Sequence, residues 1–234
     1  MPQKTNIEWT DYTTNPKEDE LSELVRSMAI SGKRVLVCDM CDLFHLDVES
    51  DMIDSLFAVF ALRPDVTFQV LTKRINRADL YLSDPSLPKR VTDRSVEIQT
   101  NTTRFMNQCG TDGWWPLKNV WIGTSVENQK MAERRIPALN RCDAAVRFLS
   151  CEPLLGEIDF KKIKPSNAKI HWVIVGGESG HNARPCDVNW IRSMIQQCDL
   201  AGVPCFVNQL GGKRDKRSDP SKWTEDLRVR RFPS

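Results

Sequence analysis

The sequence predicts an α/β fold, a parallel (β/α) barrel or partial barrel that is TIM-like, and two observations lead to it. Short β-branched runs recur along the chain, and several are almost wholly apolar, such as Trp172–Val175. Runs of that kind are typical of parallel strands that are covered on both faces. Segments of helical character separate the runs, which favours βαβ units with right-handed crossovers. Seven such strands suit a barrel or an incomplete barrel, and a doubly wound open sheet is the structural alternative.

The expected strands share a high content of β-branched and other apolar residues, and polar residues or glycines follow them. In chain order they are Thr5–Trp9, Arg34–Asp39, Thr67–Leu71, Asn119–Thr124, Ala145–Ser150, Ile170–Gly176 and Pro204–Gln209.

Helices are expected between these strands. Asp51–Leu62 has apolar residues at helical spacing and is stopped by Pro64, and Asn128–Asn140 follows a strand. Asp187–Ala201 begins at Asp187, a residue type that caps helix N-termini, and closes at Gly202, the residue type that favours the left-handed C-cap.

The domain organisation expected is one barrel-like domain over residues 1–210, followed by a basic C-terminal tail over 211–234. An insertion around residues 82–116 contains several prolines and glycines. We expect it to hold a helix over Asp93–Asn107 and then a loop above the barrel mouth. Such insertions are commonly functional lids, and a solvated excursion is the alternative.

Composition bounds the class of protein. The chain has 234 residues, 40% of them hydrophobic and 27% charged, which is enough for one large α/β domain. No apolar run approaches the roughly 20 residues that cross a bilayer, and the first segment lacks a secretory apolar core. A cytoplasmic protein is therefore expected, with its eight cysteines reduced. The net charge is +2, with an excess of positive charge in the tail that can touch phosphate or simply be a solvated end.

Polar residues follow the strands, where the chemistry of parallel α/β folds gathers. After successive strands come Asp39, Asp42 and His45; Thr72, Lys73 and Arg74; Thr124, Ser125 and Glu127; Ser150, Cys151 and Glu152; Gly176, Gly177, Glu178 and Ser179; and Asn208 and Gln209. The arrangement resembles a ligand site, although loops are polar in general.

Three pairs of these residues suggest particular chemistry. Glu152 and Glu178 each closely follow an apolar strand, and a carboxylate there can hold an ammonium group or a ribose hydroxyl. Gly176 and Gly177 permit backbone amides to approach a ligand closely. Lys73 with Arg74 can clamp a phosphate or carboxylate, and an ordinary ion pair with a neighbouring acid is the alternative.

Metal and hydrolytic motifs are weak. Cys38-x-x-Cys41 with His45 resembles half a metal site, but no second pair follows at zinc-like spacing, so no metal is predicted. No Ser–His–Asp order, phosphate-binding loop or H-E-x-x-H motif is recognisable, so no catalytic residue is assigned. His171 opens a strand and favours a structural role, whereas His181 follows the glycine-rich turn and is open to either reading.

Several segments occur in a characteristic order along the chain: Ile7–Asp11, Asp42–His45, Leu71–Arg74, Trp121–Glu127, Ser150–Gly156, Trp172–Gly180, Ala183–Pro185 and Glu225–Arg230. Together they resemble a known family, the phage and prophage three-cysteine-motif proteins. The resemblance runs nearly end to end. It implies a barrel similar to radical-SAM enzymes, in which three thiolates hold a 4Fe–4S cluster and the open iron binds S-adenosylmethionine. By association, it also implies modification of nucleic acid in a phage context.

This chain departs from the family pattern near its N-terminus. Asn15-Pro16 runs directly into Lys17, and no cysteine occurs before Cys38, so the three-cysteine segment is absent. At least one strand–helix unit, roughly 30 residues, is expected to be missing with it. The ligands of a 4Fe–4S cluster are therefore not expected in this form, while S-adenosylmethionine binding stays possible.

The resulting prediction is a cluster-less relative that binds a nucleotide-like small molecule or nucleic acid at the C-terminal strand ends. The residues assigned to that site are Lys73, Arg74, Ser125, Glu127, Glu152, Gly176, Gly177 and Glu178. The alternatives are a non-catalytic interaction or nucleic-acid-binding protein that acts through its basic tail, and an inactive deletion form. A partner protein that fills the missing segment is a further expectation.

Overall fold

The computed structural model describes residues 22, 25–26, 30–38, 41–98, 113–163, 169–213 and 217–233. The chain forms two compact units, and each is described by itself. Unit 1 comprises Met1–Ile122 with Cys142–Ala145, and unit 2 comprises Gly123–Arg141 with Val146–Ser234.

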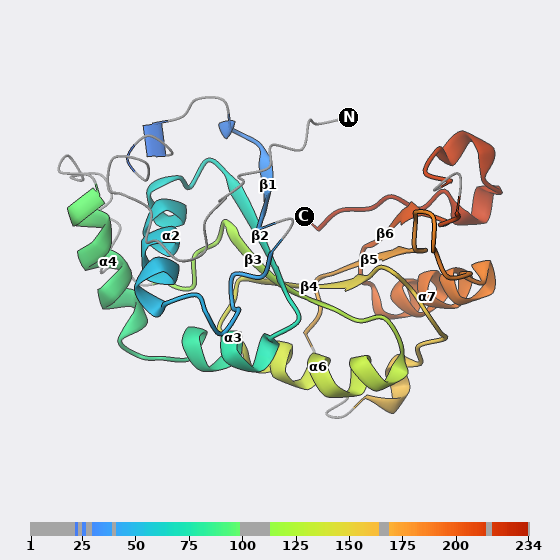
Figure 1. Ribbon diagram of the computed structural model, residues 1–234, viewed down its shortest axis with the longest axis horizontal. Coiled ribbons are helices and arrows are strands. Elements are labelled where there is room, and N and C mark those ends of the chain that lie inside the picture. Colours follow the sequence, from blue (N-terminus) through green and yellow to red (C-terminus); the bar gives the residue numbers. More distant parts are fainter. Residues whose placement is uncertain are drawn as a thin grey trace. The chain divides into compact units, whose positions relative to one another are not determined.

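The sheet of the described residues has six strands, and their order in the sheet follows their order in the chain (Figure 1). The strands are β1 (Arg34–Val37), β2 (Thr67–Thr72), β3 (Val120–Ser125), β4 (Val146–Cys151), β5 (Trp172–Gly176) and β6 (Cys205–Gln209). β1 pairs with β2, β4 with β5, and β5 with β6 in parallel. In a doubly wound sheet the strand order reverses at a switch point, whereas here each strand lies beside the one that precedes it in the chain. The predicted class, an α/β parallel partial barrel, is confirmed.

Burial explains why the strands were readable from sequence. Val35, Val173 and Val175 are at most 1% exposed, as expected for strands covered on both faces. Each expected strand that lies in the described part of the chain matches an observed one to within about two residues at either end. The expected strand Thr5–Trp9 lies outside the described residues.

Among the described residues, five longer helices accompany the strands: α2 (Ser50–Leu62), α3 (Ile75–Leu82), α4 (Leu87–Ile98), α6 (Gln129–Arg141) and α7 (Val188–Ala201). The predicted caps of α7 are confirmed. The Asp187 carboxylate accepts a hydrogen bond from the Asn189 amide at 2.8 Å, and Gly202 takes the left-handed conformation with φ 64°. Both caps satisfy backbone groups that the helix leaves without a partner.

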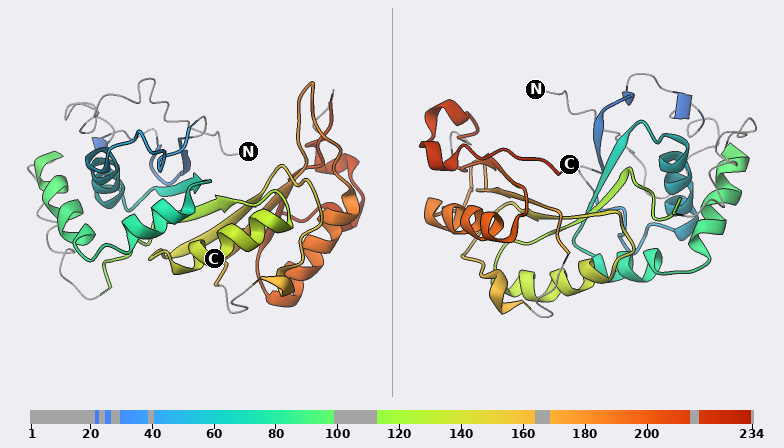
Figure 2. Two further views of the ribbon diagram at one scale, coloured as in Figure 1. Left: turned by 60° about the horizontal axis from the view of Figure 1, so that its bottom comes forward. Right: turned by 180° about the vertical axis from the view of Figure 1, so that it is seen from behind.

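The segment around residues 82–116 differs from its prediction. α3 was not expected, and α4 begins at Leu87 rather than at Asp93, with Pro88 in its first turn, where proline is tolerated. α4 packs along α2 (Figures 1 and 2), and Arg90 Nε donates to Asp54 Oδ2 at 2.9 Å. Residues 99–112, which form part of the proposed lid, lie outside the described residues.

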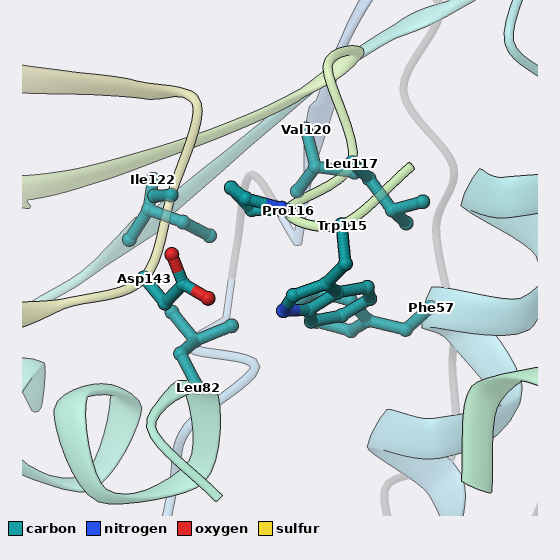
Figure 3. Close-up of a pocket in the computed structure, with 9 residues that line it drawn as sticks. Phe57, Leu82, Trp115, Pro116, Leu117, Val120, Ile122 and Asp143 are labelled. Carbon is teal, nitrogen blue, oxygen red and sulfur yellow. The ribbon is translucent and has the colours of Figure 1, made fainter. Parts of the chain in front are cut away.

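The end of this segment returns to the core of unit 1. Trp115 lies against Phe57, with ring centroids 6.4 Å apart, and Leu117 is 8% exposed. Figure 3 shows both rings beside a small pocket that Leu82 and Asp143 also line. Apart from the Asp143 carboxylate its lining is apolar, and its volume of about 10 Å³ has room for little more than a water molecule.

The C-terminal residues are part of unit 2 rather than a solvated end. Phe206 on β6 forms an antiparallel bridge with Arg230, and the Val207 amide donates to the Val229 carbonyl at 2.8 Å. Trp223 is 5% exposed. Residues 229–231 therefore lie along β6 and occupy hydrogen-bonding groups of an edge strand that would otherwise face solvent.

Gly123 provides a sharp test of packing in unit 2. A Cβ atom at this position on β3 would lie 2.4 Å from the ring of Phe148, which is 1% exposed. We expect Gly123→Ala to lower the free energy of unfolding by about 1–3 kcal/mol through overpacking. The measurement is chemical denaturation of the full chain.

Gly156→Ala is the matched control, because a Cβ there would meet only Asn128 Cβ at an ordinary 3.8 Å. Equal stability of the two variants would contradict the packing described for Gly123.

Candidate functional site

Glu152 lies directly after β4 and is half-buried at the carboxyl end of the strand. The Asn208 amide nitrogen on β6 donates to both Glu152 oxygens, at 2.9 and 2.8 Å. β5 lies between these two strands, and Gly176 closes it. A Cβ at Gly176 would lie 3.0 Å from the Glu152 carboxyl carbon. The missing side chain of Gly176 therefore leaves the room in which Glu152 and Asn208 meet, and the amide fixes the plane of the carboxylate.

The next glycine serves a different contact. A Cβ at Gly177 would lie 2.5 Å from the Leu210 carbonyl oxygen, so backbone of the chain itself occupies the space beside it. The Gly177 amide donates to the Gln209 carbonyl at 3.0 Å, and the Gln209 side chain returns a bond to the Gly177 carbonyl at 2.8 Å. In this structure Gly177 lets the loops after β5 and β6 pack backbone to backbone.

Glu178 is held by Arg184. The Arg184 Nε and Nη2 atoms donate to its two oxygens at 2.7 and 2.9 Å, and the Arg184 amide donates at 2.9 Å. These hydrogen bonds lower the pKa of Glu178 to about 2, and the hydrogen bonding of the Arg184 side chain has the largest effect. The Arg184 side chain is 59% exposed, so the pair presents a fixed guanidinium at the surface of the glycine-rich turn.

Ser125 and Glu127 lie at and after the end of β3. Arg135 Nη1 on α6 donates to Glu127 Oε2 at 2.9 Å and to the Ser125 carbonyl at 2.8 Å. The side chains of Glu127 and Arg135 are only 13% and 15% exposed, and Ser125 is 5% exposed. This pair is therefore mostly enclosed. Glu127 also contributes, after Glu178, to raising the pKa of Arg184, which places the two acids in one electrostatic neighbourhood.

Lys73 and Arg74 lie in unit 1, after β2. Arg74 Nη1 donates to Asp42 Oδ2 at 3.0 Å, and the Lys73 amide donates to the same oxygen at 3.0 Å. The Thr72 hydroxyl donates to the other Asp42 oxygen at 2.6 Å. For Arg74, the structure shows the ordinary ion pair that was the alternative to an anion clamp.

The remaining candidate residues are buried, form structural hydrogen bonds, are exposed, or lie outside the described residues. Cys38 is buried, and burial followed by the Cys41 thiol raises its pKa, which disfavours the thiolate that metals bind. His171 Nδ1 accepts from the Arg147 amide at 3.0 Å, and burial lowers the pKa of this imidazole. His181 is exposed, and Asp39 lies outside the described residues.

An iron–sulfur cluster finds no ligand set in the described part of the chain. Among those residues no three His, Cys, Asp or Glu side chains gather as a metal site would require. We therefore derive no chemical step through such a cluster.

Three side chains of this region were missed or undervalued in the sequence. Arg135 lies eight residues beyond Glu127, and Arg184 six beyond Glu178, spacings that carry no local signal. Asn208 was noted as a strand-end residue, but its bond to Glu152 spans 56 positions of the chain and depends on the strand order. If the strand order had been assumed, a search for polar residues two strands away from each strand-end acid would have predicted this bond.

Comparison with known proteins gives one match. A family model described as "Protein of unknown function (DUF5131)" matches residues 17–230. No curated protein and no solved structure matches the chain. Among the described residues, no helix has the length and apolar character to cross a membrane.

The Glu178–Arg184 pair predicts a pH effect on stability. The pKa of Glu178 is lowered from the ordinary 4.5 to about 2 in the folded chain. The ionised Glu178 carboxylate therefore stabilises the folded chain above pH 4.5, and this stabilisation is lost as the pH falls from 4.5 towards 2. We expect Glu178→Gln to be less stable than the unmodified chain at pH 7 and to match it near pH 2, as measured by thermal unfolding.

The matched control is Glu157→Gln, which changes an exposed glutamate of the same unit. A stability gap for Glu178→Gln that stays constant from pH 7 to pH 2 would refute the assigned role of the ion pair.

Proposed function

Since the chain belongs to this family of unknown function, whose match covers residues 17–230, we propose a function from the geometry of unit 2 and the resemblance noted in the sequence. The chain binds a nucleotide-like small molecule at the carboxyl ends of β4, β5 and β6. In this proposal it is a relative of the radical-SAM-like barrels that keeps their ligand pocket without the three-cysteine segment.

The observation that supports the proposal most is the carboxylate of Glu152, oriented by Asn208 beside the bare backbone of Gly176. A carboxylate held in a fixed plane is prepared to accept hydrogen bonds from ribose hydroxyls or from an ammonium group without a further ordering cost. Its half-buried position strengthens such bonds relative to those made in bulk water.

The Glu178–Arg184 pair adds a cation to the same end of β5. An exposed guanidinium whose orientation is fixed by a fork of hydrogen bonds can bind a carboxylate or phosphate. A ligand with hydroxyl or ammonium donors and an anionic group would complement both features. S-adenosylmethionine has this combination, with its ribose, ammonium and carboxylate groups.

The alternative function through the basic tail has less support in the described residues. Arg230 Nη2 donates to the Asn208 and Ser218 carbonyls, both at 3.2 Å, and Arg217 Nη2 donates to the Leu210 carbonyl at 3.0 Å. Arg228 Nε donates to the Trp223 carbonyl at 3.0 Å. These arginines hold the tail to unit 2, whereas a phosphate-binding tail needs its cations directed outward.

Isothermal titration of the full chain with S-adenosylmethionine and with adenosine tests the proposal. We expect binding of S-adenosylmethionine that is roughly tenfold weaker or lost in Glu152→Gln, because a charge-assisted hydrogen bond contributes about 1.5–3 kcal/mol. Glu157→Gln, which changes an exposed glutamate away from the strand ends, should bind like the unmodified chain.

The proposal fails if neither ligand binds to the folded chain, or if Glu152→Gln leaves the affinity unchanged. Salt-sensitive binding of single-stranded nucleic acid that persists in Glu152→Gln would favour the function through the tail instead.

A further inference from the structure

Unit 2 contains a mostly apolar cavity of about 160 Å³ that is partly open to solvent. Its walls come from α6, α7, the short 3₁₀ helix η2 (Phe160–Lys162), and strands β4 and β5, and α6, η2 and α7 are visible in Figures 1 and 2. The lining residues are Ile136, Leu149, Phe160, Ile163, Ile170, Val173, Gln197, Cys198, Ala201 and Val203. Leu149 and Val173 are register partners that lie three residues before Glu152 and Gly176 on the same strands.

The chemistry of the lining is neutral. No charged side chain lines the cavity, and its one amide is already satisfied. Gln197 Nε2 donates to the Ile158 carbonyl at 2.8 Å, and its Oε1 accepts from the Phe160 amide at 2.8 Å. The Cys198 thiol is buried, and the neighbouring Cys205 thiol and burial raise its pKa, so it stays uncharged. The cavity therefore offers surface for dispersion contacts and no group that would recognise a charge.

The walls are fixed in place, which keeps the cavity from collapsing. Gln197 ties η2 to α7 through the bonds just given. Gln129 ties it to α6, since its Oε1 accepts from the Asp159 amide at 2.7 Å and its Nε2 donates to the Asp159 carbonyl at 3.3 Å.

We infer that this cavity is a binding site for a small, neutral, apolar molecule of about the size of a benzene ring or a short hydrocarbon chain. Size supports this occupant, because a cavity of about 150 Å³ with aliphatic and aromatic walls is large enough to bind benzene. The inference goes beyond the proposed nucleotide-like ligand and does not depend on it.

Methyl-labelled NMR of the full chain, titrated with benzene and separately with benzoate, tests the inference. Benzene should shift the methyl signals of Ile136, Ile163 and Ile170, and should leave Ile75 of unit 1 unchanged. Benzoate should cause much smaller shifts at equal concentration, because no charged side chain of the lining compensates for any loss of hydration of its carboxylate. Benzene should also raise the thermal unfolding midpoint of the chain.

Cys198→Leu places a larger side chain in the cavity and should abolish the benzene shifts. Cys186→Leu makes the same exchange at a half-buried cysteine outside the lining and should retain them. If Cys198→Leu does not fold, Val203→Phe, a change at a half-buried wall residue, takes its place with the same expected loss.

Three results would overturn the inference. They are equal shifts with benzene and benzoate, benzene shifts that persist when the cavity is filled, and shifts of the cavity methyls on raising protein concentration without any ligand. The last result would mean that a second copy of the chain covers this site.

Discussion

The close approach of two backbone segments, one after β5 and one after β6, is the constraint on which the rest of unit 2 depends. The Gly212 amide donates to the Glu178 carbonyl at 2.9 Å, and Ser179 bridges Gly212 in parallel. A Cβ at Gly211 would lie 2.7 Å from the same Glu178 carbonyl, so the approach requires glycine on both segments. Beside this approach, the Glu178 carboxylate accepts from Arg184, and Asn208 donates to Glu152 at the carboxyl end of the sheet.

Ionic groups at the strand ends of both units are used in a common way. Asp42, Glu127 and Glu178 each accept from an arginine that lies further along the chain, Arg74, Arg135 and Arg184 respectively. The Glu127 and Glu178 pairs each tie a strand end to the segment that follows it, and the Asp42 pair ties the loop after β1 to the end of β2. The amide of Asn208, two strands away, donates to both oxygens of Glu152 and orients its carboxylate. This fixed orientation is why we propose the ligand-binding role for Glu152.

Much of the fold could be predicted from sequence because the signals that specify it are local. Continuous apolar runs identified the six described strands, and Asp187 and Gly202 identified the ends of α7. The start of α4 was placed too late because Pro88 reads as a breaker, although proline is compatible with a first turn. The site was less predictable. Its position at the strand ends followed from the fold class, but the partners of Glu152, Glu178 and Arg74 depend on contacts that no short-range pattern records.

The pairing of residues 229–231 with β6 has a consequence for how the chain behaves at high concentration. With the Val207 amide and the Cys205 carbonyl already bonded to Val229 and Arg231, β6 presents no open ladder to a strand from another molecule. Phe232 packs on Phe206, with ring centroids 5.0 Å apart, and anchors the end of this cover. Intermolecular β-pairing at this side of the sheet, the first step towards an ordered aggregate, would require the C-terminus to peel away first. Residues 229–232 thus shield β6 from pairing with a strand of another chain.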